Sequence, residues 1–499
     1  MTWRRVFLNC SAMLILAVPS WAQTYWPAKE WRTSTPEEQG LDSEKLREAL
    51  DYIRQHSVSI HSLLIVRNGY VVLDAYFFPY NQRDPHDVAS VTKSITSTLV
   101  GIAIDEGKIK SVQQPAISFF PEGSVGNNND RKQRMTVEHL LTMSSGLQCE
   151  PRKNELTLLE MKESKNWVKF MIDLPMAEEP GQKFVYCSGG MHLLSGIISQ
   201  VQGQSADAFA RRSLFKPLGI RTALWPADPQ GVSDGWGDLH LHPRDMAKIG
   251  YLWLNRGVWN GRRVVSADWI DRSTRPSPAS SEYGYGIWIR SDAGIYEAVG
   301  RGGQRISVVP SKNIVVVMSG GGFEPGDVGK FLLAAVKSDQ PLAANPAAVA
   351  RLNEAVKRAT LAPAAKPVAP LPSLAMRISG KTFEFDQNLL GLKQLNLAFK
   401  AGGKPGAEAT MRSVFNTRRF TIGLDDIPRL SPHGRFNLPV GLKGFWRDNE
   451  TFVLDYDEIA NINHYQFEMK FSERDVLVKL SEKTGTAKLE FAGRVKDKN

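Results

Sequence analysis

The sequence predicts an α+β protein in two folded parts: a domain of helices packed on a sheet, then a small antiparallel β domain. Between residues 42 and 337, apolar residues at helical spacing alternate with short β-type runs. Beyond residue 373 the apolar residues recur with a period near two, and turn residues separate the runs. An Ala/Pro-rich stretch over 361–372 separates the two patterns and indicates a semi-rigid linker.

The first 22 residues have the pattern of a signal peptide. Arg4 and Arg5 precede an apolar run over 6–18, and the small residues Ser20 and Ala22 suit cleavage after Ala22. The run is too short for a membrane span, which takes about 20 apolar residues, and no later stretch approaches one. We therefore expect an exported protein, periplasmic or secreted.

The first domain is expected over 23–340. A capped helix begins at Asp42-Ser43, and a β-hairpin over 62–77 turns at Asn68-Gly69. The other elements expected here are helices over 90–106, 191–201, 243–254 and 327–337, and strands over 285–289, 295–299, 306–310 and 314–318.

A short helix beginning at Asn345-Pro346 and the linker occupy 341–372, and the second domain is expected over 373–499. Its alternating runs predict a small antiparallel sandwich or barrel. These runs are 383–385, 395–397, 420–422, 452–454, 467–471, 476–478 and 489–491.

Composition excludes several classes of protein. The 499 residues are 42% hydrophobic and 23% charged, which is too apolar for a disordered chain. The net charge of +10 falls to +8 without Arg4 and Arg5, and the basic residues are scattered, so we expect no nucleic-acid partner. The nine histidines lack metal-ligand spacing and no phosphate-binding Gly loop occurs, so neither metal nor cofactor is expected.

The candidate chemistry begins at Ser90-Val91-Thr92-Lys93. Three residues apart on a helix, Ser90 and Lys93 share a face, and free N–H groups at the helix start could stabilise an oxyanion. The competing interpretation is a capping serine and a surface lysine. A second such tetrad over 213–216 is followed by Pro217, and a Gly-x-Ser-x-Gly string over 231–235 lies in a predicted loop.

Five ordered stretches extend the signal beyond one tetrad. They are Ser90-Val91-Thr92-Lys93-Ser94, the run 140–147, Tyr186-Cys187-Ser188-Gly189-Gly190, the run 243–248, and Gly300-Arg301-Gly302-Gly303-Gln304. Together they resemble the penicillin-recognising serine hydrolases over about residues 39–336. That family includes class C β-lactamases, family VIII carboxylesterases, D-aminopeptidases and 6-aminohexanoate-oligomer hydrolases. The second domain resembles the lipocalin-like β-barrels often appended to it.

The resemblance implies a β-lactamase/transpeptidase-like fold, with an antiparallel sheet flanked by helices plus a helical subdomain. By position, Ser90 is the expected nucleophile of an acyl-enzyme, Lys93 its partner, and Tyr186 the second acid/base group. Ser188 stands where many relatives have Asn, and a hydroxyl lacks the two-donor reach of an amide.

The family's third motif, Lys-Thr-Gly or His-x-Gly, corresponds to Arg301-Gly302-Gly303. Here the glycines are expected to let substrate approach the backbone, and the Gln304 N–H to complete an oxyanion hole with that of Ser90. Arg301 could bind a substrate carboxylate, or it could be a solvated arginine. A literal Lys483-Thr484-Gly485 lies between two strands of the second domain, where a hairpin turn is expected.

Two cysteines follow the signal, Cys149 and Cys187, and both lie on active-site segments of the resembled family. In an oxidising compartment we expect them to form a disulfide, the alternative being two buried thiols.

The resulting function hypothesis is a serine hydrolase of small ester, amide or peptide-like substrates. The alternatives are a β-lactamase or D-Ala peptidase and, from another class, a non-catalytic protein that binds cell-wall peptides or β-lactams. The sequence does not determine the oligomeric state.

Overall fold

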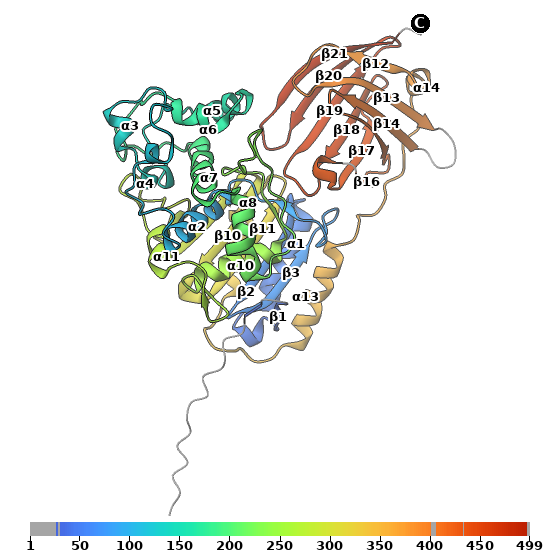
Figure 1. Ribbon diagram of the computed structural model, residues 1–499. Helices are drawn as coiled ribbons and strands as arrows, with labels where there is room; N and C mark the ends of the chain where they lie inside the picture. The colour runs from blue at the N-terminus through green and yellow to red at the C-terminus, as the bar shows by residue number, and fades with distance from the viewer. Residues whose placement is uncertain (1–25, 28–29, 401–405, 433, 497–499) are drawn as a thin grey trace, which may run out of the picture.

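The computed structural model describes residues 26–27, 30–400, 406–432 and 434–496 (Figure 1). The predicted signal peptide, 1–22, lies outside the described residues. The predicted α+β architecture is confirmed: a β-lactamase/transpeptidase-like domain is followed by an antiparallel β-barrel. No helix in the described part of the chain is both long and apolar enough to cross a membrane.

A seven-stranded sheet forms the centre of the first domain, in the order β1-β3-β2-β11-β10-β9-β8. Its strands are β1 (Arg32–Thr33), β2 (Ile60–Arg67), β3 (Tyr70–Tyr76), β8 (Trp288–Arg290), β9 (Ile295–Gly300), β10 (Gln304–Val309) and β11 (Ile314–Gly320). All neighbours are antiparallel except β1 and β3. The β2–β3 hairpin pairs with β11, so two distant segments of the chain close one sheet.

The strand expected over 285–289 begins only at Trp288, which corrects the prediction. Gly286 has φ of +70° and lies against helix α2 (Val91–Asp105), where Ser94 Oγ donates to the Gly286 carbonyl at 2.5 Å. This packing against the helix turns the chain before the strand can start.

Helices cover both faces of the sheet. α1 (Ser43–Gln55), α12 (Pro325–Ala335) and α13 (Pro346–Ala359) pack on one face, and α13 is longer than the short helix expected there. Asp42 caps α1 as predicted, because its carboxylate accepts from the Glu44 and Lys45 N–H groups. The other face carries α2 and α10 (Pro243–Leu254).

A helical subdomain lies beyond α2 (Figure 1). Its helices are α3 (Asp130–Arg134), α4 (Val137–Leu141), α5 (Arg152–Glu163), α6 (Trp167–Asp173) and α7 (Ser188–Gln202), and α8 (Ala206–Ala210) and α9 (Lys216–Leu218) follow in the chain. Helix α11 (Ala267–Ser273) and the short pairs β4 (His86–Asp87) with β5 (His240–Leu241), and β6 (Val258–Trp259) with β7 (Arg262–Arg263), complete the domain.

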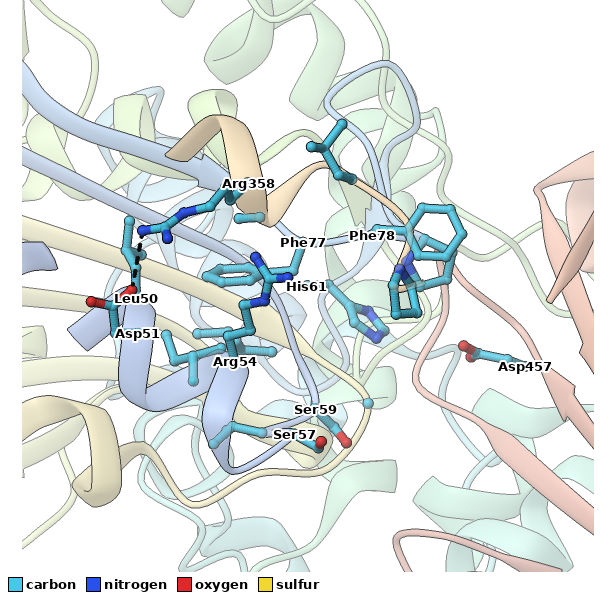
Figure 2. Close-up of a pocket in the computed structure, with 18 of the residues that line it drawn as sticks. Leu50, Asp51, Arg54, Ser57, Ser59, His61, Phe77, Phe78, Arg358 and Asp457 are labelled. Atoms are coloured by element: carbon cyan, nitrogen blue, oxygen red, sulfur yellow. Dashed lines mark hydrogen bonds and ion pairs between the residues drawn. The ribbon is translucent and has the colours of Figure 1, made fainter. Parts of the chain in front are cut away.

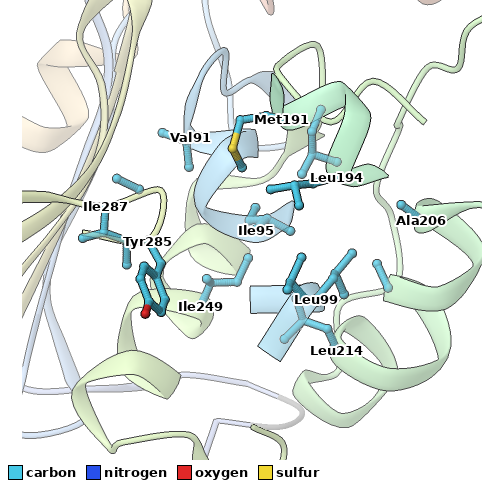
Figure 3. Close-up of a cluster of buried hydrophobic side chains, with 14 of the residues drawn as sticks. Val91, Ile95, Leu99, Met191, Leu194, Ala206, Leu214, Ile249, Tyr285 and Ile287 are labelled. Carbon is cyan, nitrogen blue, oxygen red and sulfur yellow. The ribbon is translucent and has the colours of Figure 1, made fainter. Parts of the chain in front are cut away.

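Helix α2 is buried on nearly every side. Figure 3 shows Val91, Ile95 and Leu99 of this helix facing apolar side chains from α7, α10 and the 285–287 turn. The helix also buries small polar side chains, of which Ser94 and Thr96 donate to backbone carbonyls of neighbouring segments. A helix enclosed in this way has its position fixed by its neighbours. The start of α2 is therefore rigidly placed.

The second domain is a nearly closed ten-stranded antiparallel barrel, preceded by α14 (Ser373–Ile378). Its strands are β12 (Thr382–Phe385), β13 (Leu392–Lys400), β14 (Gly406–Ser413), β15 (Thr417–Ile422), β16 (Arg429–Ser431), β17 (Val440–Trp446), β18 (Thr451–Asp457), β19 (His464–Phe471), β20 (Asp475–Glu482) and β21 (Lys488–Val495). A bridge between Gly423 and Lys443 joins the two sides. Strands β14, β16 and β17 were not predicted, because small residues such as Ala407, Ala409 and Gly444 weaken the alternation in β14 and β17, and β16 has only three residues.

One end of the barrel docks on the first domain. Antiparallel neighbours place the β16–β17, β18–β19 and β20–β21 connections at that same end. A small apolar interface forms there, in which Ile459 and Ala460 of the barrel pack with Tyr76 and Tyr80.

A cavity of about 340 Å³ lies where α1, α13, the linker and the barrel meet. Figure 2 shows Arg54 and Asp51 of α1, Arg358 of α13 and Asp457 of the barrel around it. No predicted catalytic residue lines this cavity, so it is separate from the candidate active site.

Replacing Gly101 of α2 by Ala is expected to destabilise the protein by about 1–3 kcal/mol, since the new Cβ would stand 2.5 Å from the Trp269 ring. The matched control is Gly329→Ala in α12, where no atom lies within 4 Å of an added Cβ. That change should leave stability equal or raise it by about 0.5–1 kcal/mol. Urea unfolding followed by circular dichroism measures both, and equal midpoints for the two variants would contradict the packing argument.

Candidate active site

Ser90 lies at the N-terminus of α2, directly after a constrained turn. Ala89 has φ of +46°, a conformation that a non-glycine residue rarely adopts. The buried carboxylate of Asp87 holds this turn, because its Oδ1 accepts the Ala89 N–H at 2.7 Å. Ser90 makes no side-chain cap, so its hydroxyl is not used to start the helix as the competing interpretation proposed.

Lys93 is buried, with 1% of its surface exposed, and is not a surface lysine. Its Nζ lies 2.7 Å from Ser90 Oγ and donates to the Trp236 carbonyl at 2.8 Å. One helical turn therefore places a buried amine within hydrogen-bond distance of a half-buried serine hydroxyl.

The segment that carries Trp236 is held between two helices. An added Cβ at Gly235 would lie 2.3 Å from the Met191 carbonyl of α7, and Thr96 Oγ1 of α2 donates to the Gly235 carbonyl at 2.9 Å. Gly235, the last residue of the Gly-x-Ser-x-Gly string, therefore allows close packing of a loop against two helices.

Asp234, the residue before Gly235, is also buried, and burial raises the pKa of its carboxyl group to about 7.

Tyr186 lies on the other side of Lys93, whose Nζ stands 4.9 Å from the centroid of the phenol ring. The ring stacks on Trp288 at 6.0 Å and meets Tyr283 edge-on at 6.3 Å. Phe184 completes this aromatic cluster, which orients the tyrosine. Ser90, Lys93 and Tyr186 are brought together from sequence positions almost 100 residues apart.

Cys149 and Cys187 are joined by a disulfide with a Cα–Cα distance of 5.9 Å. Cys187 follows Tyr186 and is the N-cap residue of α7, so the cross-link ties the tyrosine segment to the loop after α4. The disulfide and the aromatic cluster hold this side of the site from two directions.

Ser188 is the first residue of α7 and is 2% exposed. Its buried hydroxyl has no hydrogen-bond partner among the described residues. An unpartnered buried hydroxyl is costly, and because this one is shielded from the surface, its contact with substrate stays a prediction.

The β9–β10 turn, Arg301–Gly303, forms the opposite wall. Gly300 packs closely against the turn that precedes Ser90: an added Cβ at Gly300 would lie 2.5 Å from the Val88 carbonyl oxygen. Gly302 and Gly303 have φ of +83° and +95°, which explains why glycine stands at both positions.

Protein side chains cover these glycines where substrate had been expected to approach. An added Cβ would lie 2.4 Å from Ile462 at Gly302 and 2.3 Å from Phe323 at Gly303. The side chain of Gln304 is used internally, since its amide exchanges two hydrogen bonds with the backbone of Gly320. The residue is fully buried, and the role of its N–H as an oxyanion donor stays a prediction.

Arg301 is not a freely solvated arginine. Its Nη1 donates to Thr484 Oγ1 at 2.6 Å and its Nη2 to Asn463 Oδ1 at 2.8 Å, both from the barrel. The Lys483-Thr484-Gly485 string forms the β20–β21 turn as predicted, but its contact with Arg301 was not foreseen. No sequence signal pairs a turn near residue 484 with one near residue 301. Trp236, Ile462 and Asn463 were missed for the same reason, whereas Asp87 was missed although its contact with Ala89 is local.

Among the described residues, no group of three or more His, Cys, Asp and Glu side chains could hold a metal ion. The geometry available for chemistry is thus a serine, an amine and a phenol beside a backbone turn. Together, fold and site define a protein of the β-lactamase/transpeptidase class.

Comparison with known proteins agrees with that class. A family model described as Beta-lactamase matches residues 46–337, and the chain belongs to this family of serine hydrolases, which includes esterases and amidases. The 6-aminohexanoate-dimer hydrolase of Paenarthrobacter ureafaciens is 28% identical over 220 residues, covering 42% of this chain and 56% of that protein. The chain thus spans little more than half the length of that relative.

Two further proteins are similar over a larger share. A putative D-alanyl-D-alanine carboxypeptidase of Salmonella paratyphi B is 20% identical over 368 residues, covering 58% of this chain and 85% of that one. A solved structure, a putative 6-aminohexanoate-dimer hydrolase from Bacillus anthracis, superposes with a TM-score of 0.51 at 20% identity, covering 61% of this chain and 86% of that one. At that identity the superposition shows a shared fold.

Replacing both Cys149 and Cys187 by Ser is expected to lower the free energy of unfolding by about 2–4 kcal/mol, since the cross-link closes a loop of 38 residues. In the unfolded, unreduced chain without residues 1–22, Ellman's reagent should find no free thiol. Two titrated thiols would show that the pair is not bonded in solution.

Proposed function

We propose that the protein is an exported serine hydrolase that cleaves an ester or amide bond through a Ser90 acyl-enzyme. The observation that carries the proposal is the 2.7 Å contact between Lys93 Nζ and Ser90 Oγ at the start of a buried helix. The alternative, a capping serine and a surface lysine, explains neither this contact nor the burial of Lys93. Membership of a family of serine hydrolases supports the same conclusion.

In the proposed reaction, Ser90 Oγ attacks the substrate carbonyl while its proton passes to the Lys93–Tyr186 pair. The backbone N–H groups of Ser90 and Gln304 stabilise the oxyanion. Tyr186 then delivers the proton to the leaving alcohol or amine. Water repeats these steps on the acyl-enzyme, which releases the acid and restores the serine.

Small esters and amides are favoured over β-lactams as substrates. Ser188 offers one donor where an amide would offer two, so recognition of a β-lactam or peptide side chain is weaker. The relative named 6-aminohexanoate-dimer hydrolase supports an amide substrate. Cell-wall-like peptides are the second candidate substrate class, which the relative named as a putative D-alanyl-D-alanine carboxypeptidase supports.

Export is proposed from the predicted signal peptide. The Cys149–Cys187 disulfide supports it, because such bonds persist in oxidising compartments.

A fluorophosphonate probe is expected to label the protein at Ser90 and to leave the Ser90→Ala variant unlabelled, because the probe reacts only with an activated serine. Mass spectrometry of the labelled peptide identifies the site. Ser97 of the same helix provides a control, since Ser97→Ala should label like the parent. An unlabelled parent protein would instead favour the non-catalytic binding protein.

Tyr186→Phe is expected to lower kcat by about 10²–10⁴-fold with KM little changed, since the ring keeps its packing and only the proton-transfer group is lost. Steady-state hydrolysis of p-nitrophenyl butyrate measures the effect. Tyr251→Phe, a buried phenol away from the site, is the control and should retain parent kinetics. A Tyr186→Phe variant with parent kcat would remove the tyrosine from the mechanism.

A panel of short p-nitrophenyl esters, nitrocefin, D-alanyl p-nitroanilide and cyclic amide oligomers should give its highest kcat/KM with an ester or a small amide. The reason is the single donor at Ser188. Nitrocefin as the best substrate would reverse the proposed preference.

A further inference from the structure

The barrel reaches the nucleophile through the β18–β19 loop, 458–463. The carbonyl of Ala460 accepts the Asp87 N–H at 2.9 Å, and the Asp87 carboxylate in turn holds the Ala89 N–H at 2.7 Å. Ala89 adjoins Ser90. One residue of the first domain thus connects the barrel to the constrained turn before the nucleophile.

The same loop reaches the opposite wall of the site. Asn463 Oδ1 and Thr484 Oγ1 each accept one hydrogen bond from Arg301, and Glu482 Oε1 lies 4.0 Å from its Nη1. Glu482 also accepts from the Thr484 hydroxyl, so the acceptors of the guanidinium are themselves held in place. Hydrogen bonds in which the donor is charged are stronger than those between neutral groups.

Apolar packing adds to this contact. Ile462 is 2% exposed and occupies the place where any side chain at position 302 would stand. The Gly302 carbonyl accepts the Gly322 N–H at 3.1 Å, so the β9–β10 turn is fixed between the barrel and the end of β11.

The loop itself is firmly seated. Asn461 Oδ1 lies 2.9 Å from His240 Nε2, and Arg435 at the neighbouring β16–β17 connection pairs with Asp238 at 2.8 Å. Both partners lie a few residues beyond Trp236, whose carbonyl binds Lys93. The barrel therefore contacts three of the segments near Ser90: the turn before it, the β9–β10 turn and the segment that follows Trp236.

We infer that the C-terminal barrel is a structural part of the active site, and that Arg301, Asn463 and Thr484 are positioning residues. Their hydrogen bonds hold the β9–β10 turn, with the Gln304 N–H, at a fixed distance from Ser90. This inference rests on the proposed function and gives Arg301 a role other than binding a substrate carboxylate. A displaced turn lowers turnover of every substrate, charged or neutral, because an oxyanion donor moves.

The test compares full-length Asn463→Ala/Thr484→Val, Arg301→Ala and the combined triple variant with the parent. The substrates are p-nitrophenyl butyrate and p-nitrophenyl hemisuccinate, which share a leaving group and differ in the carboxylate of the acyl chain. Each variant should lower kcat about 10- to 100-fold on both esters, since a displacement of about 1 Å can cost 10²-fold. The triple variant should lose no more than Arg301→Ala, because both changes remove the same contact.

Thr484→Ser keeps the hydroxyl and should stay within about threefold of the parent kcat. Lys400→Ala, which removes an exposed barrel ion pair with Glu408, is the matched control and should not change kcat. A raised KM for the hemisuccinate alone would overturn the inference and make Arg301 a substrate ligand. Losses that multiply in the triple variant would overturn it as well.

Hydrogen exchange of residues 300–304 gives a readout that does not depend on activity. Exchange of these amides should rise in Asn463→Ala/Thr484→Val and stay at the parent level in Lys400→Ala. Unchanged exchange would overturn the inference even if Ser90 is labelled by the fluorophosphonate. Raised exchange in a protein that is not labelled would mean that the proposed function fails and the positioning role stands.

Discussion

Burial of helix α2 is the constraint on which the rest of the first domain depends. Its apolar surface is covered by α7, α10 and the sheet, so its N-terminus cannot shift without opening the core (Figure 3). The backbone positions of Ser90 and Lys93 are therefore fixed as well, because Ser90 lies at the start of the helix and Lys93 lies in its first turn. The cost is an amine buried at 1% exposure, which the Ser90 hydroxyl and the Trp236 carbonyl offset.

The elements around α2 each hold one further part of the site. Asp87 keeps Ala89 at a positive φ, the aromatic cluster and the disulfide hold Tyr186, and the barrel holds the β9–β10 turn. The strained backbone conformation of Ala89 persists only because several surrounding contacts hold it together. Preorganisation of this kind is what a reaction through an oxyanion requires, since donors then need not move as charge develops.

The two domains are coupled through a small number of polar contacts at one end of the barrel. Interfaces between domains usually permit relative motion unless they are large and apolar. Here the apolar contacts include a cluster around Ile459 and the packing of Ile462 over Gly302. The charged side chains of Arg301 and Arg435 add hydrogen bonds of defined geometry. An appended barrel thereby becomes part of a wall that the first domain alone would leave incomplete.

Local sequence patterns determined the α+β class, the helices at Ser43 and Val91, the β2–β3 hairpin and the barrel, because periodicity, capping and turn residues act over a few positions. The Ser-x-x-Lys spacing singled out Ser90 and Lys93 as candidates, and the family resemblance added Tyr186. Only the tertiary structure decided that Gly286 turns the chain before β8, that Ile462 covers Gly302, and that Thr484 binds Arg301. Such contacts join residues up to 183 positions apart, and their formation depends on how completed elements pack, which no local pattern records.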